Sequence, residues 1–153
     1  MKSSIEKDHS VAFRALIAAF FVNFLGYAFI VPILPSWQTQ FDINATQATL
    51  LVSLWAVPMF LMGPMSGRIT DRFGAGTTIL TSLVLLTISS GVYLLATNEW
   101  LPHPFLALCL ARLLHGASGA TIMTAGLAAA SQLWPTRFGE MAGKLLGIAA
   151  IGG

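Results

Sequence analysis

Long, nearly uncharged apolar segments alternate with short polar connections along the 153-residue chain. They cover residues 15–36, 46–67, 77–97, 104–131 and 141–153. The first four are long enough to cross about 30 Å of hydrocarbon as helices, which takes about 20 residues, and none shows the period-2 alternation of a strand. The pattern therefore predicts an all-α integral membrane protein with four complete spans, the start of a fifth, and an N-terminal tail over residues 1–14.

The basic residues predict how these spans are oriented. Of the eight Lys and Arg residues, seven lie in the tail, between spans two and three, or between spans four and five and at the start of span five. They are Lys2, Lys7, Arg14, Arg68, Arg72, Arg137 and Lys144. The other two connections have none, and an excess of Lys and Arg marks the cytoplasmic loops of membrane proteins. We therefore expect a multi-pass protein of the plasma or inner membrane with a cytoplasmic N-terminus.

The composition narrows the function classes. Hydrophobic residues make up 56% of the chain and charged residues 9%, whereas a soluble domain has about 25% charged residues, so a soluble enzyme or nucleic-acid module is excluded. Cys109 is the one cysteine, and His9, His103 and His115 lack ligand spacing. No disulfide framework, metal site or other cofactor is therefore expected. A membrane enzyme is also disfavoured, because no acidic residue lies inside a predicted span to build a catalytic cluster.

The connection between spans two and three has a charged motif framed by glycines. It reads Gly-Arg-Ile-Thr-Asp-Arg-Phe-Gly over residues 67–74. Glycine suits sharp turns and close helix approach, and an acid at a helix junction suits a neighbouring helix N-terminus. The string and its position resemble the signature loop of the major facilitator superfamily, although Ala75 and Gly76 stand where that family usually has two basic residues. The resemblance implies a conformational latch that consists of Gly67, Asp71, Arg72 and Gly74.

The fourth predicted span contains an arginine and a histidine. Arg112 and His115 are three residues apart, so they share one helix face. An arginine inside a span costs at least about 2.5 kcal/mol and indicates function by default; the alternatives are outward snorkelling or hydrogen bonds to backbone carbonyls. For His115 the alternative is a hydrogen bond across a packed surface, which Gly116 and Gly119 would allow. The string resembles the fourth-helix motif of the same superfamily, which is associated with proton-coupled drug and amine exporters.

Spans one and five extend the resemblance. Asn23 precedes a Val-Pro-Ile-Leu-Pro-Ser string over residues 31–36, which resembles the first helix of drug exporters and vesicular amine transporters. Those amine carriers typically have an acid at the position of Asn23, so selectivity for cationic amines is not expected. A helix–helix hydrogen bond is the alternative role of Asn23. In span five, the glycine spacing resembles the glycine-rich helix of the antiporter branch and implies packing roles for Gly143, Gly147 and Gly152.

The resemblance covers about residues 12–153 and implies the N-terminal portion of a six-helix half-bundle, in a transporter with about twelve spans in two such halves. It implies small-molecule transport by alternating access, as proton-coupled export of the multidrug or metabolite antiporter type. Arg112, His115 and Asn23 would lie on the substrate and proton pathway. The implied partners are the substrate, the proton, the lipid bilayer and a missing C-terminal half, and no nucleic acid. As a fragment, the chain is not expected to transport alone; the alternative is a non-transporting helix-packing partner or a truncated inactive product.

Overall fold

The computed structural model describes residues 2–98 and 100–152, with side chains from residue 9 onward. Over these residues the regular elements are all helical. They are α1 (Lys2–Ala28), α2 (Ile30–Gln40), α3 (Ala45–Ser53), α4 (Ala56–Phe73), α5 (Ala75–Thr97), α6 (Pro104–Leu133), the 3₁₀ helix η1 (Pro135–Arg137) and α7 (Phe138–Gly152).

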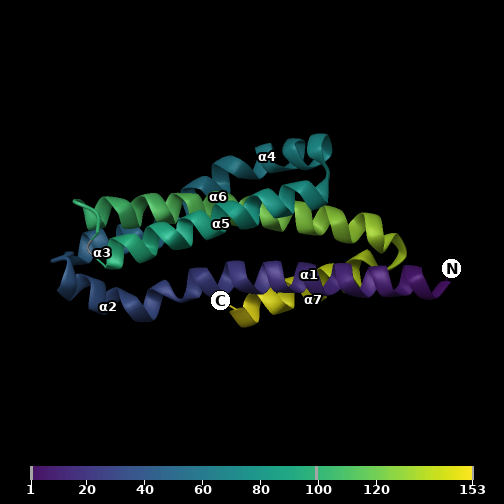
Figure 1. Cartoon of the computed structure of the whole chain (residues 1–153), viewed down its shortest axis with the longest axis horizontal. Coiled ribbons are helices and arrows are strands. Elements are labelled where there is room, and N and C mark those ends of the chain that lie inside the picture. The colour runs from purple at the N-terminus through teal and green to yellow at the C-terminus, as the bar shows by residue number, and fades with distance from the viewer. Residues whose placement is uncertain (1, 99, 153) are drawn as a thin grey trace.

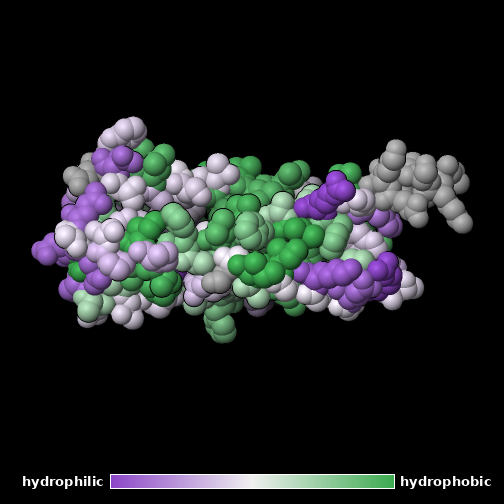
Figure 2. Space-filling model, turned by 90° about the horizontal axis from the view of Figure 1, so that it is seen from below, coloured by the Kyte–Doolittle hydropathy of each residue, from purple (hydrophilic) through white to green (hydrophobic). Residues whose placement is uncertain are grey.

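Four stretches of this structure are long and apolar enough to cross a membrane. They cover residues 9–40, 45–73, 75–97 and 104–133. The prediction of an all-α protein with four spans and a further helix is therefore confirmed, and the chain is a multi-pass membrane protein. Figure 2 shows the expected surface: apolar residues cover the middle of the visible face, and polar residues gather toward its two ends.

The structure differs from the predicted segments mainly at their ends. Helix α1 begins at Lys2, inside the predicted tail over residues 1–14, while Met1 and the predicted end of span five at Gly153 lie outside the described residues. Helix α4 continues to Phe73, so the predicted connection over residues 68–76 is reduced to Gly74. A continuing helix satisfies its own backbone groups, and the chain reverses only where glycine allows φ +82° and ψ 153°.

Spans one and two each consist of two helices, and each break precedes a proline. A proline has no N–H to donate to the carbonyl four residues earlier, and its ring crowds that carbonyl. Pro32 stands four residues after Ala28, the last residue of α1. Pro58 stands four residues after Leu54, the C-cap of α3. Pro64, by contrast, lies inside α4 without ending it.

Helix α6 is the centre of the bundle. Its apolar stretch is 56% buried, against 17–28% for the other three spans. Helices α4 and α5 pack along it, while α1 contacts it from another side and also pairs with α7 (Figure 1). Hydroxyl groups link α5 to α6: Ser82 Oγ donates to Thr121 Oγ1 at 2.6 Å, and Ser89 Oγ donates to the Ala111 carbonyl at 2.7 Å. Such bonds hold helices together where lipid supplies no hydrophobic driving force.

Candidate functional site

Small residues on α6 bring its backbone close to α1 and α4. A Cβ on Gly116 would collide with the Trp55 carbonyl oxygen and the Pro58 ring, and one on Gly119 would lie 3.2 Å from Asn23 Oδ1. Gly126 lies against Phe20 in the same way. These close approaches place side chains of three spans around the middle of α6.

Of the three glycines in span five that are predicted to pack against another helix, only one has a close neighbour among the described residues. A Cβ on Gly152 would lie 3.0 Å from the Phe21 carbonyl oxygen, so α7 approaches α1 closely at this point. No atom lies within 4 Å of a Cβ built on Gly143 or Gly147 among the described residues. The packing role of these two glycines therefore stays a prediction.

Arg112 is buried in α6, and its side chain donates two hydrogen bonds to the backbone of span two. Its side chain has no exposed surface. Nε donates to the Leu51 carbonyl at 2.9 Å, and Nη2 donates to the Val52 carbonyl at 3.2 Å. Nη1 is buried without a hydrogen-bond partner in the part of the chain that the structure describes. Arg112 therefore holds the backbone of span two through two hydrogen bonds and keeps one donor group unused.

Aromatic side chains surround the guanidinium. It lies over the Tyr27 ring, 5.1 Å from the centroid, which is the geometry of a cation–π contact. The Tyr27 ring contacts Trp55, with 4.6 Å between ring centroids. Tyr93 lies within electrostatic range of Arg112, although its hydroxyl forms no hydrogen bond within the described residues and neither does Trp55 Nε1. The unused polar groups of Arg112, Trp55 and Tyr93 are all capable of donating.

His115 and Asn23 connect α6 to α1. His115 Nε2 lies 2.9 Å from the Asn23 carbonyl oxygen, and because a carbonyl only accepts, Nε2 is the donor. In the neutral ring this leaves Nδ1 as an acceptor. The Asn23 side chain is fully buried, and both its Oδ1 and its Nδ2 have no partner among the described residues.

No described acid balances Arg112. The ion pairs within the described residues join Glu140 to Arg137 at 2.8 Å and to Lys144 at 2.7 Å, at the start of α7. These three side chains are exposed, and the Arg137 guanidinium and the Lys144 ammonium lower the pKa of Glu140 to about 2. The buried cation of α6 is instead compensated by carbonyl oxygens and an aromatic face.

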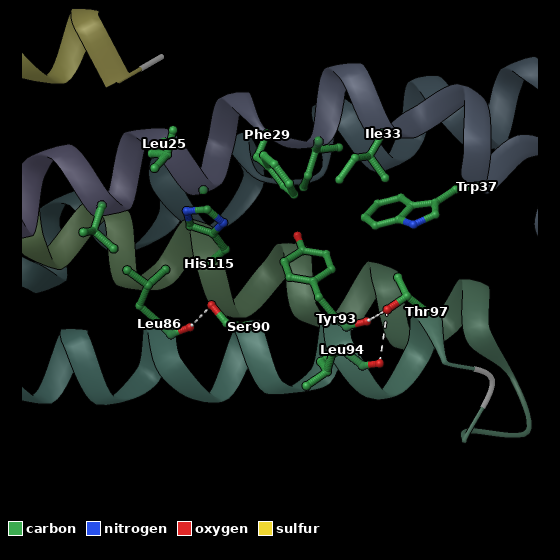
Figure 3. A pocket seen from close by; sticks show the side chains of 13 residues that line it. Leu25, Phe29, Ile33, Trp37, Leu86, Ser90, Tyr93, Leu94, Thr97 and His115 are labelled. Carbon is green, nitrogen blue, oxygen red and sulfur yellow. Dashed lines mark hydrogen bonds between the residues drawn. The ribbon is translucent and has the colours of Figure 1, made fainter.

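A cavity of about 620 Å³ lies beside this cluster, between span one and α5 (Figure 3). Its walls are mainly apolar and aromatic, and Trp37 and Tyr93 stack across it with 6.0 Å between ring centroids. His115, Ser90 and Thr97 add polar groups, while no acidic residue lines it. An environment of this kind suits an apolar or aromatic molecule with few polar groups.

The predicted latch residues lie apart from this cluster, at the junction of α4 and α5. Asp71 and Arg72 are exposed, and the Arg72 guanidinium lies 5.2 Å from the centroid of the Phe73 ring. The N-cap residue of α5 is Gly74, which has no side chain to cap the helix, so the capping part suggested for Asp71 stays a prediction. Gly74 needs its glycine, whereas a Cβ on Gly67 would meet nothing within 4 Å.

The structure brings together Arg112, His115 and Asn23, and adds residues that the sequence did not single out. Tyr27 lies against the guanidinium, Trp55 packs on Tyr27, and Tyr93 lines the cavity. Gly26 faces the His115 ring, which would lie 2.9 Å from a Cβ at that position. Tyr27 stands four residues after Asn23, so helical spacing alone could have placed it on the same face. The described residues contain no cluster of ligands suited to a metal ion.

Comparisons with known proteins point to one family. The sequence profile of the Major Facilitator Superfamily matches residues 16–153. Multidrug resistance protein 2 of Bacillus subtilis is 30% identical over 125 residues, which cover 82% of this chain and 30% of that protein. Multidrug resistance protein 1 of the same organism is 25% identical over 114 residues, covering 74% and 28%. Quinolone resistance protein NorA of Staphylococcus aureus is 26% identical over 103 residues, covering 67% and 25%.

These relatives are much longer than this chain, which spans only 25–30% of their length. The match is nevertheless continuous over the described spans, and it agrees with the all-helical bundle and the glycine-framed junction of α4 and α5. The chain belongs to the Major Facilitator Superfamily.

Proposed function

We propose that these spans serve transmembrane transport of a small molecule by alternating access, in the direction of export and coupled to protons. The observation that carries the proposal is Arg112, a fully buried cation in a membrane span with one unused donor nitrogen. Ionisable groups at this depth are costly and mark substrate or ion pathways by default. Family membership and the drug-resistance names of the relatives support the same reading.

The proposed substrate is an aromatic or apolar molecule with an oxygen acceptor, rather than an amine cation. Arg112 Nη1 would donate to that oxygen, with Tyr93 and Asn23 as further polar contacts. Asn23 has no charge with which to attract an amine, and no acid lies in a predicted span. The apolar cavity beside His115 and Tyr93 supports a substrate of this polarity.

The proposed coupling ion is the proton. His115 has a free acceptor nitrogen when neutral, which makes it a proton acceptor candidate within the described spans. A carboxylate in the additional length of the relatives is the other candidate, because the spans of this chain contain no acid at the depth of Arg112. The N-terminus is proposed to be cytoplasmic. Gly67, Asp71, Arg72 and Gly74 are proposed to form the inner latch against the other half of a full-length transporter.

A second candidate is a helix-packing partner without transport activity. Gly143 and Gly147 favour it, because they are four residues apart and nothing lies within 4 Å of a Cβ at either position. Such a small-residue pair permits close packing of another membrane helix. We rank it below transport, since it gives no role to the buried cation.

The test is substrate counterflow in proteoliposomes, with a quinolone that carries no basic amine as the probe. We expect a full-length protein that carries these spans to show counterflow, and the 153-residue chain alone to show none. In the full-length protein, Arg112→Ala and Asp71→Ala should each lower counterflow at least about tenfold, which corresponds to roughly 1.4 kcal/mol. Leu110→Ala is the matched control, because Leu110 lies on α6 and is 50% exposed. Unchanged counterflow in both variants would exclude these site assignments.

A further inference from the structure

The second span has a gap in its backbone hydrogen bonds. Leu54 N–H donates to the Leu50 carbonyl at 2.8 Å, as in a regular helix, but Val57 N–H reaches only the Leu54 carbonyl, at 3.4 Å. Leu54 and Trp55 keep right-handed helical dihedral angles, so the chain continues to wind through the gap. The carbonyls that would bond to the amides of residues 55 and 56 in a continuous helix belong to Leu51 and Val52.

Arg112 donates to these same two carbonyls. Its Nε and Nη2 lie 2.9 Å from the Leu51 oxygen and 3.2 Å from the Val52 oxygen. A guanidinium presents donors in a fixed planar fork, so one side chain can serve two neighbouring carbonyls. In a membrane no bulk water is available to these carbonyls, and the break therefore needs a partner from within the protein.

Gly116 completes the contact one turn further along α6. Arg112 and Gly116 are four residues apart and share a helix face. Any Cβ at 116 would collide with the Trp55 carbonyl oxygen and the Pro58 ring, so the broken segment packs directly on the α6 backbone. One residue of α6 supplies hydrogen bonds to the break and the other supplies space for it.

Pro58 alone does not account for the gap. Pro64 removes a backbone donor in the same span, yet α4 continues through it without interruption. What distinguishes the position of Pro58 is the presence of Arg112 and Gly116 on the facing helix.

We propose that Arg112 is a positioning residue that holds span two in its broken form, and so sets the direction of α3 relative to α4. Its Nη1 has no hydrogen-bond partner among the described residues and is not needed for this role. A ligand whose oxygen accepts a hydrogen bond from the same guanidinium would therefore also affect the geometry of the break between α3 and α4. This positioning role of Arg112 is independent of transport activity.

The experiment measures the direction of α3 in the full chain, reconstituted in lipid nanodiscs. Spin labels replace Ala45, at the start of α3, and His103, at the start of α6, both of which are exposed. Cys109 is changed to Ser in every sample. Helix α3 has nine residues and is therefore about 13 Å long, so a change in bend of about 20–25° moves its outer end by about 5 Å. Double electron–electron resonance resolves such a shift.

We expect Arg112→Ala to move or broaden the distance distribution by about 5 Å, because the two carbonyls lose their donors. Adding Pro58→Ala should give one narrow peak again, since the restored amide allows a continuous helix that satisfies the carbonyls itself. Pro64→Ala is the matched control and should neither disturb the original distribution nor rescue Arg112→Ala.

Two results would overturn the inference. One is an Arg112→Ala distribution identical to that of the unmodified protein. The other is equal rescue by Pro58→Ala and Pro64→Ala. If Arg112→Ala does not accumulate, Arg112→Lys replaces it: a lysine keeps the charge but lacks the planar fork, so it should broaden the distribution, and an unchanged distribution would refute the proposal. Loss of counterflow with unchanged distances would leave the transport proposal standing and exclude this one.

Discussion

Gly116→Ala is the substitution whose effect follows most directly from the structure. The added methyl group would collide with the Trp55 carbonyl oxygen and with the Pro58 ring. One obstacle is backbone and the other is a rigid ring, so neither moves aside as the end of a flexible side chain would. Relief requires α6 to separate from span two, and that separation would also lengthen the hydrogen bonds from Arg112 to Leu51 and Val52.

The magnitude combines two opposing terms. Alanine is favoured over glycine in a helix interior by about 1 kcal/mol. Overpacking a tight site costs about 1–3 kcal/mol, and two rigid obstacles favour the upper end. We therefore expect Gly116→Ala to lower the free energy of unfolding by about 2 kcal/mol. The matched control is Gly91→Ala in α5, where nothing lies within 4 Å of the new Cβ; it should gain up to about 1 kcal/mol.

The assay is reversible unfolding of the full chain in lipid bicelles, with the free energy of unfolding as the readout. The two variants should differ by about 3 kcal/mol and in opposite directions from the parent protein. The reasoning fails if Gly116→Ala is as stable as the parent, or if both substitutions change stability by the same amount. Either result would mean that α6 does not approach span two as closely as the structure shows.

Two other residues give predictions at the polar ends of the helices. Gly74→Ala should destabilise the chain by about 1–3 kcal/mol, because φ +82° with ψ 153° is open essentially to glycine alone; Gly76→Ala, with nothing within 4 Å of its Cβ, is the control, and equal effects in bicelle unfolding would contradict the prediction. The Glu140 carboxyl should titrate near pH 2 in a carbon-13 NMR measurement, because Arg137 and Lys144 lower its pKa from 4.5 to about 2. Since the folded-state pKa is the lower one, the stabilisation from this ion cluster is complete above about pH 4.5 and is lost as the pH falls through about 2. A midpoint that stays near 2 after Arg137→Gln would refute the assigned cause.

The site shows where sequence reasoning reached its limit. The sequence placed Arg112 and His115 on one face of the fourth span, because their spacing fixes this in any helix. It left three possibilities open for Arg112: substrate contact, outward snorkelling, and hydrogen bonds to backbone carbonyls. The structure gives two donors to carbonyls and leaves Nη1 unused. Sequence could not choose, because the accepting carbonyls lie 60 and 61 residues earlier in the chain.

The sequence also could not tell which prolines would interrupt a helix. Four prolines lie within spans one and two, and each removes one backbone donor. Only the positions of Pro32 and Pro58 coincide with an interruption in the described helices, while Pro35 and Pro64 are carried inside α2 and α4. The local chemistry is equal at all four. What differs is the neighbouring helix, which in the case of Pro58 offers Arg112 as a donor and Gly116 as space.

The sequence by itself determined the helical class, the number of long spans and the presence of a cation within the fourth. These properties follow from the length and polarity of local segments, because a lipid solvent requires each span to satisfy its own backbone and to exclude charge. Tertiary structure alone decided that α6 lies at the centre, that its glycines face Asn23, Phe20 and Trp55, and that its arginine bonds to a distant break. Those features depend on which faces of separate helices meet, and that register is set by packing between segments far apart in the chain.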